Sequence, residues 1–143
     1  MPYKFLDIIA ADIAVEVKAS SLEKVFSDSG IAVAATQFKN FKSIKPEIQK
    51  KISLRAENIE ELFFKFLDEL VFIKDTDNII LVKFDKIKIY KKGNLHALEC
   101  LASGDKLDLK KHGNIVDIKA ITMHMFEIKK KKSEWYAKFV LDV

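Results

Sequence analysis

The sequence predicts an α+β fold in a single domain over residues 1–143, with two helices packed on a mostly antiparallel β-sheet. Two stretches repeat apolar residues at helical spacing, and each follows a helix-capping pattern. The other apolar stretches alternate with polar residues, as half-buried strands do, and turn residues separate them. A chain of 143 residues can bury one hydrophobic core but is too short for two independent ones. The expected order of elements is β-β-α-β-α-β-β-β-β.

The first third is predicted to be extended and then helical. Residues 3–18 are expected to be strand, because branched apolar residues alternate with other residues near the end of this stretch. The alternating residues are Ile13, Val15 and Val17. Ser20 and Glu23 then have the spacing of a capping box, and an apolar stripe follows. This pattern predicts a helix that runs to about Phe38.

The middle of the chain is predicted to form a connection, a strand and a second helix. Residues 39–51 are rich in lysine and contain Pro46, which is typical of a connection. The strand that follows places three apolar residues on one face: Ile52, Leu54 and Ala56. Asn58 and Glu61 repeat the capping spacing, so we expect a second helix that ends near residues 75–78.

The rest of the chain is expected to be sheet. Apolar alternation and turn residues divide it into two hairpins separated by a polar loop. The predicted segments are a strand at 79–90, a turn at 93–94, a strand at 95–102, a loop at 103–114, a strand at 115–128, a lysine-rich turn at 129–133 and a strand at 135–143.

The charge and the composition bound the classes of partner. Lysine and arginine number 25, only Arg55 is arginine, and the net charge is +4. The lysines either coat a solvated surface or form a patch that meets RNA or an acidic protein. Arginine is the usual residue for bidentate phosphate contacts, so its near absence argues against a dedicated nucleic-acid reader.

The location expected from the sequence is the cytoplasm. No apolar run reaches the roughly 18–20 residues that a membrane span needs, so no membrane association is expected. The first residues lack the basic, apolar and small-residue regions of a signal peptide. Cys100 is the only cysteine, which excludes an intrachain disulfide and a zinc site built on several cysteines.

Two carboxylates stand at the edges of apolar strands. Asp12 lies between apolar stretches, and Asp142 precedes Val143. If the last strand ends close to Asp12, then Asp12, Asp142 and the carboxylate of Val143 converge, and such like charges repel one another unless a cation neutralises them. Oxygen ligands of this kind suit a hard ion such as Ca²⁺ or Mg²⁺. The alternative is that both side chains are simply solvated.

Four polar residues before the penultimate strand are candidates for docking a partner: Lys111, His112, Asp117 and Lys119. Asp117 and Lys119 are two residues apart, so on a strand they would project from one face. Either they form a polar docking surface or they belong to an ordinary solvated face. His112 and His124 lack the spacing of a helical metal site, so we expect no histidine ligand.

Signals for catalysis are weak. The sequence has no Gly-x-Ser-x-Gly motif and no glycine-rich phosphate loop, and it contains only four glycines. Most of the 11 phenylalanines fall on the periodic apolar faces, which favours core packing over base stacking. The chain is therefore expected not to be an enzyme, and a metal-dependent hydrolase is the weaker alternative.

Four stretches, in the same order along the chain, resemble the archease family. They run from Phe5 to Ile13, from Asn58 to Phe72, from Ser103 to His124 and from Val140 to Val143. The third stretch contains Ser-Gly-Asp, Lys-His-Gly and Val-Asp-Ile-Lys-Ala-Ile-Thr-Met-His, and the fourth ends in Leu-Asp-Val. Three positions depart from the pattern: Ile9 replaces a His, Ala10 replaces a Thr, and Met123 replaces a Tyr.

The resemblance implies strand-helix-strand-strand modules and a metal site formed by Asp12, Asp142 and the carboxylate of Val143. Ca²⁺ is the expected ion, with Mg²⁺ or Mn²⁺ as alternatives. The resemblance also implies a non-catalytic activator of the RtcB-type RNA ligase of tRNA splicing. Such an activator promotes guanylylation of the ligase and its multiple turnover, and relaxes its choice of nucleotide. Contact with RNA is expected to be indirect or weak. The alternative function is a small basic module that binds nucleic acid or protein.

Overall fold

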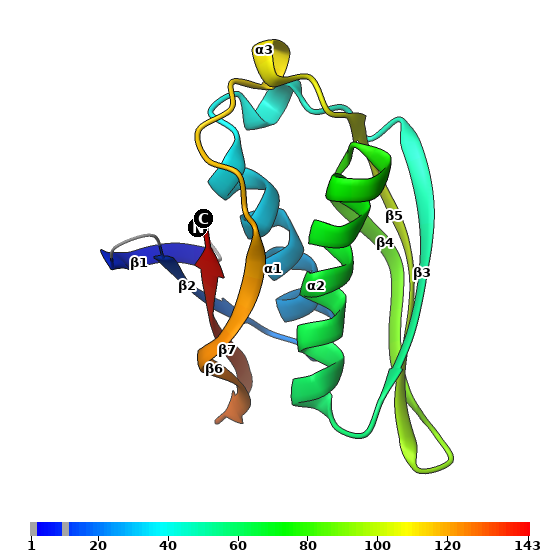
Figure 1. Ribbon diagram of the computed structural model, residues 1–143. Helices are drawn as coiled ribbons and strands as arrows, with labels where there is room; N and C mark the ends of the chain where they lie inside the picture. The colour runs from blue at the N-terminus through cyan, green and yellow to red at the C-terminus, as the bar shows by residue number, and fades with distance from the viewer. Residues whose placement is uncertain (1–2, 10–11) are drawn as a thin grey trace.

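Two antiparallel sheets enclose two long helices in the computed structural model, which describes the backbone of residues 3–9 and 12–143 and the side chains of residues 3–4 and 12–143 (Figure 1). The four-stranded sheet has the order β1 (Tyr3–Ile9), β2 (Asp12–Ala19), β7 (Glu134–Asp142), β6 (Ala120–Lys131). The three-stranded sheet has the order β3 (Ile48–Ala56), β5 (Leu95–Lys106), β4 (Ile79–Lys92). The helices are α1 (Leu22–Gln37) and α2 (Ile59–Asp77), with two short turns, η1 (Phe41–Ser43) and α3 (Leu109–His112).

The strands and long helices form two strand-helix-strand-strand modules. One module, β3-α2-β4-β5, is continuous, and its sheet order is β3-β5-β4. The other, β2-α1-β6-β7, is interrupted after α1 by the continuous module, and its sheet order is β2-β7-β6. The α+β class and the order of elements are confirmed. The strands divide between two sheets, one on each side of the helices, because each helix contacts strands of both sheets.

The phenylalanine side chains join the two modules through the core. The ring of Phe63 on α2 lies 4.9 Å from that of Phe26 on α1 and 5.8 Å from that of Phe139 on β7, between centroids. Phe66, one turn further along α2, meets Phe84 on β4 at 5.5 Å. Full burial of one such side chain contributes about 1.5–3 kcal/mol, so these rings hold both sheets against the helices.

The helix starts follow the capping chemistry, with one shift. Asn58 caps α2 as predicted, since its Oδ1 accepts the backbone N–H of Glu61 at 2.7 Å. The cap of α1 is Ser21, whose Oγ accepts the N–H of Lys24 at 3.1 Å. The capping box predicted at Ser20 is therefore wrong by one residue, because two consecutive serines offer the same chemistry.

Two strand boundaries in the second half also differ from the prediction. Strand β5 extends to Lys106, so the predicted polar loop begins later. Gly104 allows this extension, because a Cβ at that position would lie 1.8 Å from the backbone oxygen of Ile80 on β4. Strand β6 begins at Ala120 rather than at Ile115, whose N–H instead donates to the oxygen of Gln37 at the end of α1.

Strand β6 carries a wide bulge. Thr122 pairs with Val140 and Glu127 with Lys138, so four residues of β6, 123–126, face one residue of β7. Met125 within the bulge has a φ of 55°. Beyond it the strand continues to Lys131, so most of the predicted lysine-rich turn is strand.

No helix in the described part of the chain is long and apolar enough to cross a membrane.

Candidate functional site

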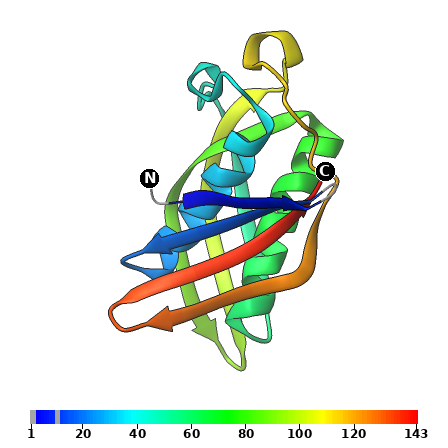
Figure 2. The same ribbon diagram turned by 90° about the vertical axis from the view of Figure 1, so that its left-hand side faces the viewer.

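Asp12 and Asp142 lie directly opposite each other in the four-stranded sheet. Asp12 is the first residue of β2 and Asp142 the last of β7, and the two are register partners. Opposite residues on antiparallel strands have Cβ atoms about 4.5–5.5 Å apart and project from the same face. The two carboxylates, 130 positions apart in the sequence, therefore meet at one end of the sheet, beside the chain end at Val143 (Figure 2). We call this end, formed by Asp12, Asp142 and Val143, the acidic tip.

The backbone around the acidic tip is well fixed. Asp142 also pairs with Ala120 of β6, and its carbonyl oxygen accepts the N–H of Lys119 at 2.8 Å. Val143 is half-buried and packs against the core. Ile9, at the position where the family pattern has histidine, is the β1 partner of Asp12, whereas Ala10 lies outside the described residues. The tip is thus anchored by strands on both sides of Asp142.

The charges of the tip fit a cation. Both aspartates are half-buried, and neither side chain forms an ion pair or hydrogen bond with another residue that the structure describes. Two close carboxylates without a cationic partner repel each other. Carboxylate oxygens suit Ca²⁺, which takes six to eight oxygen ligands, so water would complete the shell. Within the described residues no three His, Cys, Asp or Glu side chains cluster as a metal site. At the tip itself, the carboxylate of Val143 follows directly after Asp142.

His112 is a structural residue of the turn that closes one end of the molecule. Its ring is 0% exposed, with Nδ1 accepting the N–H of Asp108 at 3.3 Å and Nε2 lying 3.4 Å from Oδ2 of Asp105. The imidazole ring also packs in a T-shaped arrangement with the ring of Phe38, with 5.8 Å between the two centroids. A buried ring does not touch a partner, so His112 contributes to any docking surface only by positioning the exposed Lys111.

Asp105 anchors the same turn. Burial by itself would raise the pKa of its carboxyl, but hydrogen bonds from the backbone of Lys45, the side chain of Lys111 and the backbone of Lys106 outweigh burial and lower the pKa. The carboxylate therefore stays ionised in mildly acidic solution and holds the turn against β5.

Asp117 and Lys119 lie in the segment of residues 115–119 that leads into the tip. Both are exposed, and they precede β6 instead of standing on a strand. The interpretation that they share one strand face is therefore wrong, because Ile115 and Ile118 bond to the helices, and within this segment Lys119 alone bonds to a strand. Lys119 still reaches the tip through its backbone bond to Asp142.

A buried lysine, missed by the sequence analysis, holds this segment. Lys74 of α2 is 3% exposed, and its Nζ donates to the carbonyl oxygen of Ile118 at 2.8 Å. It also forms ion pairs with Asp117 and, at 3.2 Å, with Asp75. Gln37 of α1 completes the grip, because its Oε1 accepts the N–H of Ile118 at 3.4 Å. One signal was available: Lys74 follows Leu67, Leu70 and Val71 at helical spacing, so it stands on the apolar stripe.

A comparison with protein families places the whole described fold in one of them. The family model "Archease protein family (MTH1598/TM1083)" matches residues 3–143. The protein archease of Pyrococcus abyssi is 33% identical over 134 residues, which cover 93% of each chain. That of Pyrobaculum calidifontis is 28% identical over 134 residues, 93% of this chain and 90% of its own.

Solved structures agree with this assignment. The solution structure of Methanobacterium thermoautotrophicum protein 1598 has a TM-score of 0.84 and 27% sequence identity, with 99% of both chains covered. A Thermotoga maritima protein, described as an archease and possible chaperone, has a TM-score of 0.59 at 18% identity and covers 94% of this chain and 93% of its own, which supports the fold.

Proposed function

Because the chain belongs to the archease family, we propose that it is a non-catalytic activator of the RtcB-type RNA ligase of tRNA splicing and that it acts through a divalent cation at its acidic tip. In this proposal it promotes guanylylation of the ligase and multiple turnover, and it relaxes the choice of nucleotide. Asp12, Asp142 and the carboxylate of Val143 would hold the ion, with Ca²⁺ expected and Mg²⁺ or Mn²⁺ as alternatives.

One observation carries the proposal: the direct register of Asp12 with Asp142, next to Val143. The pairing brings two unpartnered carboxylates together, which costs free energy unless a cation compensates them. Neither side chain fills the core, so the arrangement is not explained by packing. It is explained if this end of the sheet binds a cation.

The residues of this chain would act by positioning. The bound ion supplies positive charge and open coordination sites for oxygen atoms. Lys74 and Gln37 fix the segment 115–119, and that segment fixes the backbone of Asp142. Lys111, Asp117 and Lys119 stand exposed and are available for polar contacts with the ligase. A rigid tip that enters the ligase cleft would help the guanylylation site to reach its reactive geometry, which is a positioning effect.

The test compares isosteric variants of the tip with a matched control. Asp12→Asn and Asp142→Asn each remove one ligand charge, and Asp68→Asn removes one exposed charge from α2, away from the tip. We expect the tip variants to weaken Ca²⁺ binding about tenfold or more, measured by calorimetry, and to suppress multiple-turnover ligation by a cognate ligase. The control should behave as wild type.

A further variant separates the terminal carboxylate from the side chains. Adding several residues after Val143 moves that carboxylate away and should mimic Asp142→Asn. Circular dichroism checks folding throughout. Folded tip variants that activate the ligase as well as wild type would exclude the tip as the origin of function.

A further inference from the structure

The far end of the four-stranded sheet carries the opposite charge from the acidic tip. Strand β7 runs from Glu134 at a hairpin turn to Asp142 at the tip, about 27 Å at 3.4 Å per residue. Residues 127–138, which form the hairpin end of β6 and β7, contain five lysines and two glutamates. Their net charge of +3 compares with +4 for the whole chain, and they include its only run of four consecutive lysines.

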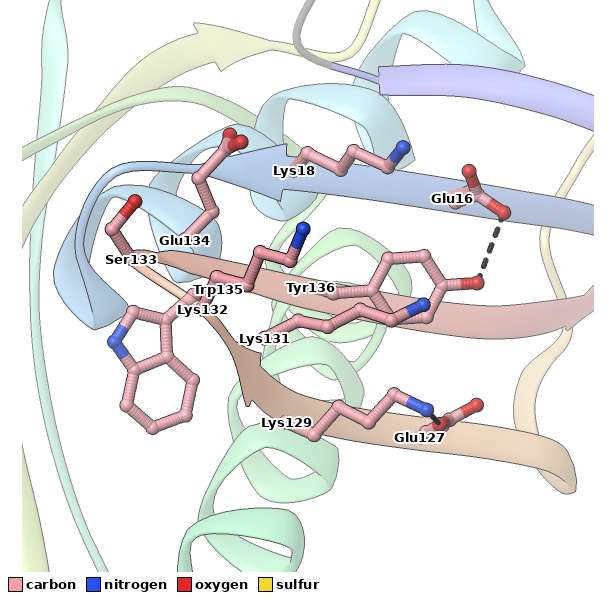
Figure 3. A pocket seen from close by; sticks show the side chains of 10 residues that line it. All are labelled: Glu16, Lys18, Glu127, Lys129, Lys131, Lys132, Ser133, Glu134, Trp135 and Tyr136. Carbon is pink, nitrogen blue, oxygen red and sulfur yellow. Dashed lines mark hydrogen bonds and ion pairs between the residues drawn. The ribbon is translucent and has the colours of Figure 1, made fainter.

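This hairpin encloses a hollow of about 490 Å³ on the outward face of the sheet (Figure 3). Its lining includes Lys18 of β2 and, from the hairpin, Lys129, Lys131, Lys132 and Tyr136. We call these five residues the lysine hairpin surface. Residues two apart on a strand project from the same face about 6.6–6.8 Å from each other, so Lys129 and Lys131 form a row along β6.

Two of the three acidic side chains around the hollow already have partners, and the third is exposed at the hairpin turn. Glu127 forms an ion pair with Lys129. Glu16 pairs with Lys4 at 3.4 Å and accepts the hydroxyl of Tyr136 at 2.9 Å. Burial favours a raised pKa at Glu16, but these partners outweigh it and lower the pKa, so the carboxylate keeps its charge and its partners.

The positive side chains, in contrast, are not all neutralised. Lys18, Lys131 and Lys132 form no ion pair with any residue in the described ranges. The Nζ atoms of Lys129 and Lys131 each lie 5.7 Å from the ring centroid of Tyr136. These cation–π contacts order both lysine side chains over the same ring. Burial and the bond to Glu16 raise the pKa of Tyr136 to about 12, so its hydroxyl adds no negative charge to the hollow.

An aromatic side chain stands at the edge of the same surface. Trp135 lines one edge of the hollow and is partly exposed, but it packs against the core, and Figure 3 shows its indole directed away from the lysine side chains. A positively charged hollow with a row of lysines is what proteins use to follow the backbone of a single-stranded nucleic acid, with the lysines on the phosphates. An acidic protein surface is the alternative occupant of the lysines, and the experiment below separates the two.

We propose that the lysine hairpin surface binds the phosphate backbone of single-stranded nucleic acid, without reading its sequence. Lysine presents a point charge and no rigid fork, so it recognises a phosphate by charge and not by base edges. The site is independent of the acidic tip, and its test requires neither the ligase nor a metal.

Two variants with the same net charge provide the test. The hairpin variant replaces the four lysines of the surface, Lys18, Lys129, Lys131 and Lys132, with glutamine. The control variant makes the same replacement at Lys83, Lys88, Lys91 and Lys92, four exposed lysines of β4 in the other sheet. Binding of a labelled RNA oligonucleotide of about 12 nucleotides is followed by fluorescence anisotropy at several salt concentrations. The fluorescence of Trp135, the only tryptophan, gives a second readout at the hairpin end of the sheet.

We expect the hairpin variant to bind at least about tenfold more weakly than wild type, and the control to bind within about threefold. The slope of log K against log salt should fall by about 0.7 for each phosphate that the variant no longer neutralises. DNA of the same sequence should bind within a few-fold of RNA, and wild-type binding should change the tryptophan emission.

Three results would overturn the proposal. One is an equal loss of affinity in the two variants, since they share a net charge. Another is polyglutamate binding as tightly as RNA, which would assign the surface to an acidic protein. The last is unaltered RNA affinity in a hairpin variant whose circular dichroism spectrum matches wild type.

Discussion

The module β3-α2-β4-β5 is continuous in the chain, whereas β2-α1-β6-β7 is divided by the whole of the first. Both modules give the same sheet order, with the last strand of each between the other two. In the continuous module the central strand, β5, pairs with β4, which directly precedes it, and with β3, at most 56 residues away. In the divided module β7 pairs with β2, more than 110 residues away.

This difference places the two candidate sites. The acidic tip and the lysine hairpin surface both belong to the divided module, at the two ends of β7. In that module residues from the two ends of the sequence, such as Asp12 and Asp142, become direct neighbours. The continuous module supplies the support: α2 carries Phe63 and Lys74, which reach across to β7 and to the segment before β6. The continuous module thus supports the backbone of the divided module, and the divided module carries both charged sites.

Phe63→Ala should have the largest effect, because its ring joins the two modules. It is fully buried against Phe26 and Phe139, and loss of such a ring costs about 3–5 kcal/mol in unfolding free energy. Urea denaturation measures the change. Phe72→Ala on the same helix removes a ring that is 58% exposed and should cost no more than about 0.5 kcal/mol. Similar losses in the two variants would show that the modules do not depend on packing at Phe63.

Lys74→Met should have an intermediate effect on stability and a local effect on the divided module. It leaves the buried carbonyl of Ile118 without its donor, which costs about 1–3 kcal/mol. Asp117 is mostly exposed, so water replaces its ion pair at little further cost. Hydrogen exchange should accelerate at the amide of Lys119, and Ca²⁺ affinity should fall. Lys65→Met, at an exposed position on the same helix, is the control. Unchanged exchange at Lys119 would contradict the positioning role of Lys74.

Asp105→Asn should have a smaller effect that depends on pH. The folded-state pKa of Asp105 is lowered, so its contribution is present above the unfolded pKa of about 3.9 and is lost as pH falls through the folded pKa. The variant should therefore be less stable than wild type at pH 7, and the difference should shrink below about pH 4. Urea midpoints at pH 7 and pH 3 measure this. A difference of equal size at both pH values would mean that the lost interaction is not one of charge.

His124→Ala should have the smallest effect. His124 is exposed in the bulge of β6, and an all-oxygen site at the tip needs no imidazole. Ca²⁺ affinity, measured by calorimetry, should stay within a few-fold of wild type. Complete loss of binding would show that the ligands of the tip are assigned wrongly.

Local chemistry was readable from the sequence, and contacts between distant residues were not. Asn58 predicted the start of α2, and alternation predicted the strands, because both patterns depend on neighbours in the chain. The division into two sheets depends on which face of each strand meets a helix, and alternation is the same on either side. Asp12 and Asp142 were linked through the family resemblance, since nothing between them in the sequence sets their register. His112 was predicted as a candidate for docking a partner, because the sequence does not show that its turn is closed by distant residues such as Phe38.

The bulge of β6 has a consequence for encounters between molecules. β6 is an edge strand, with backbone groups along its outer side that another strand can pair with. Four residues looped out against one on β7 break the regular spacing of those groups halfway along the strand. Past the bulge, Lys129, Lys130 and Lys131 place repelling charges on the remaining length. The edge of β6 therefore offers no long, flat strand for a second copy of the protein to pair with. The bulge opposes edge-to-edge pairing, which would extend the sheet from one molecule into the next.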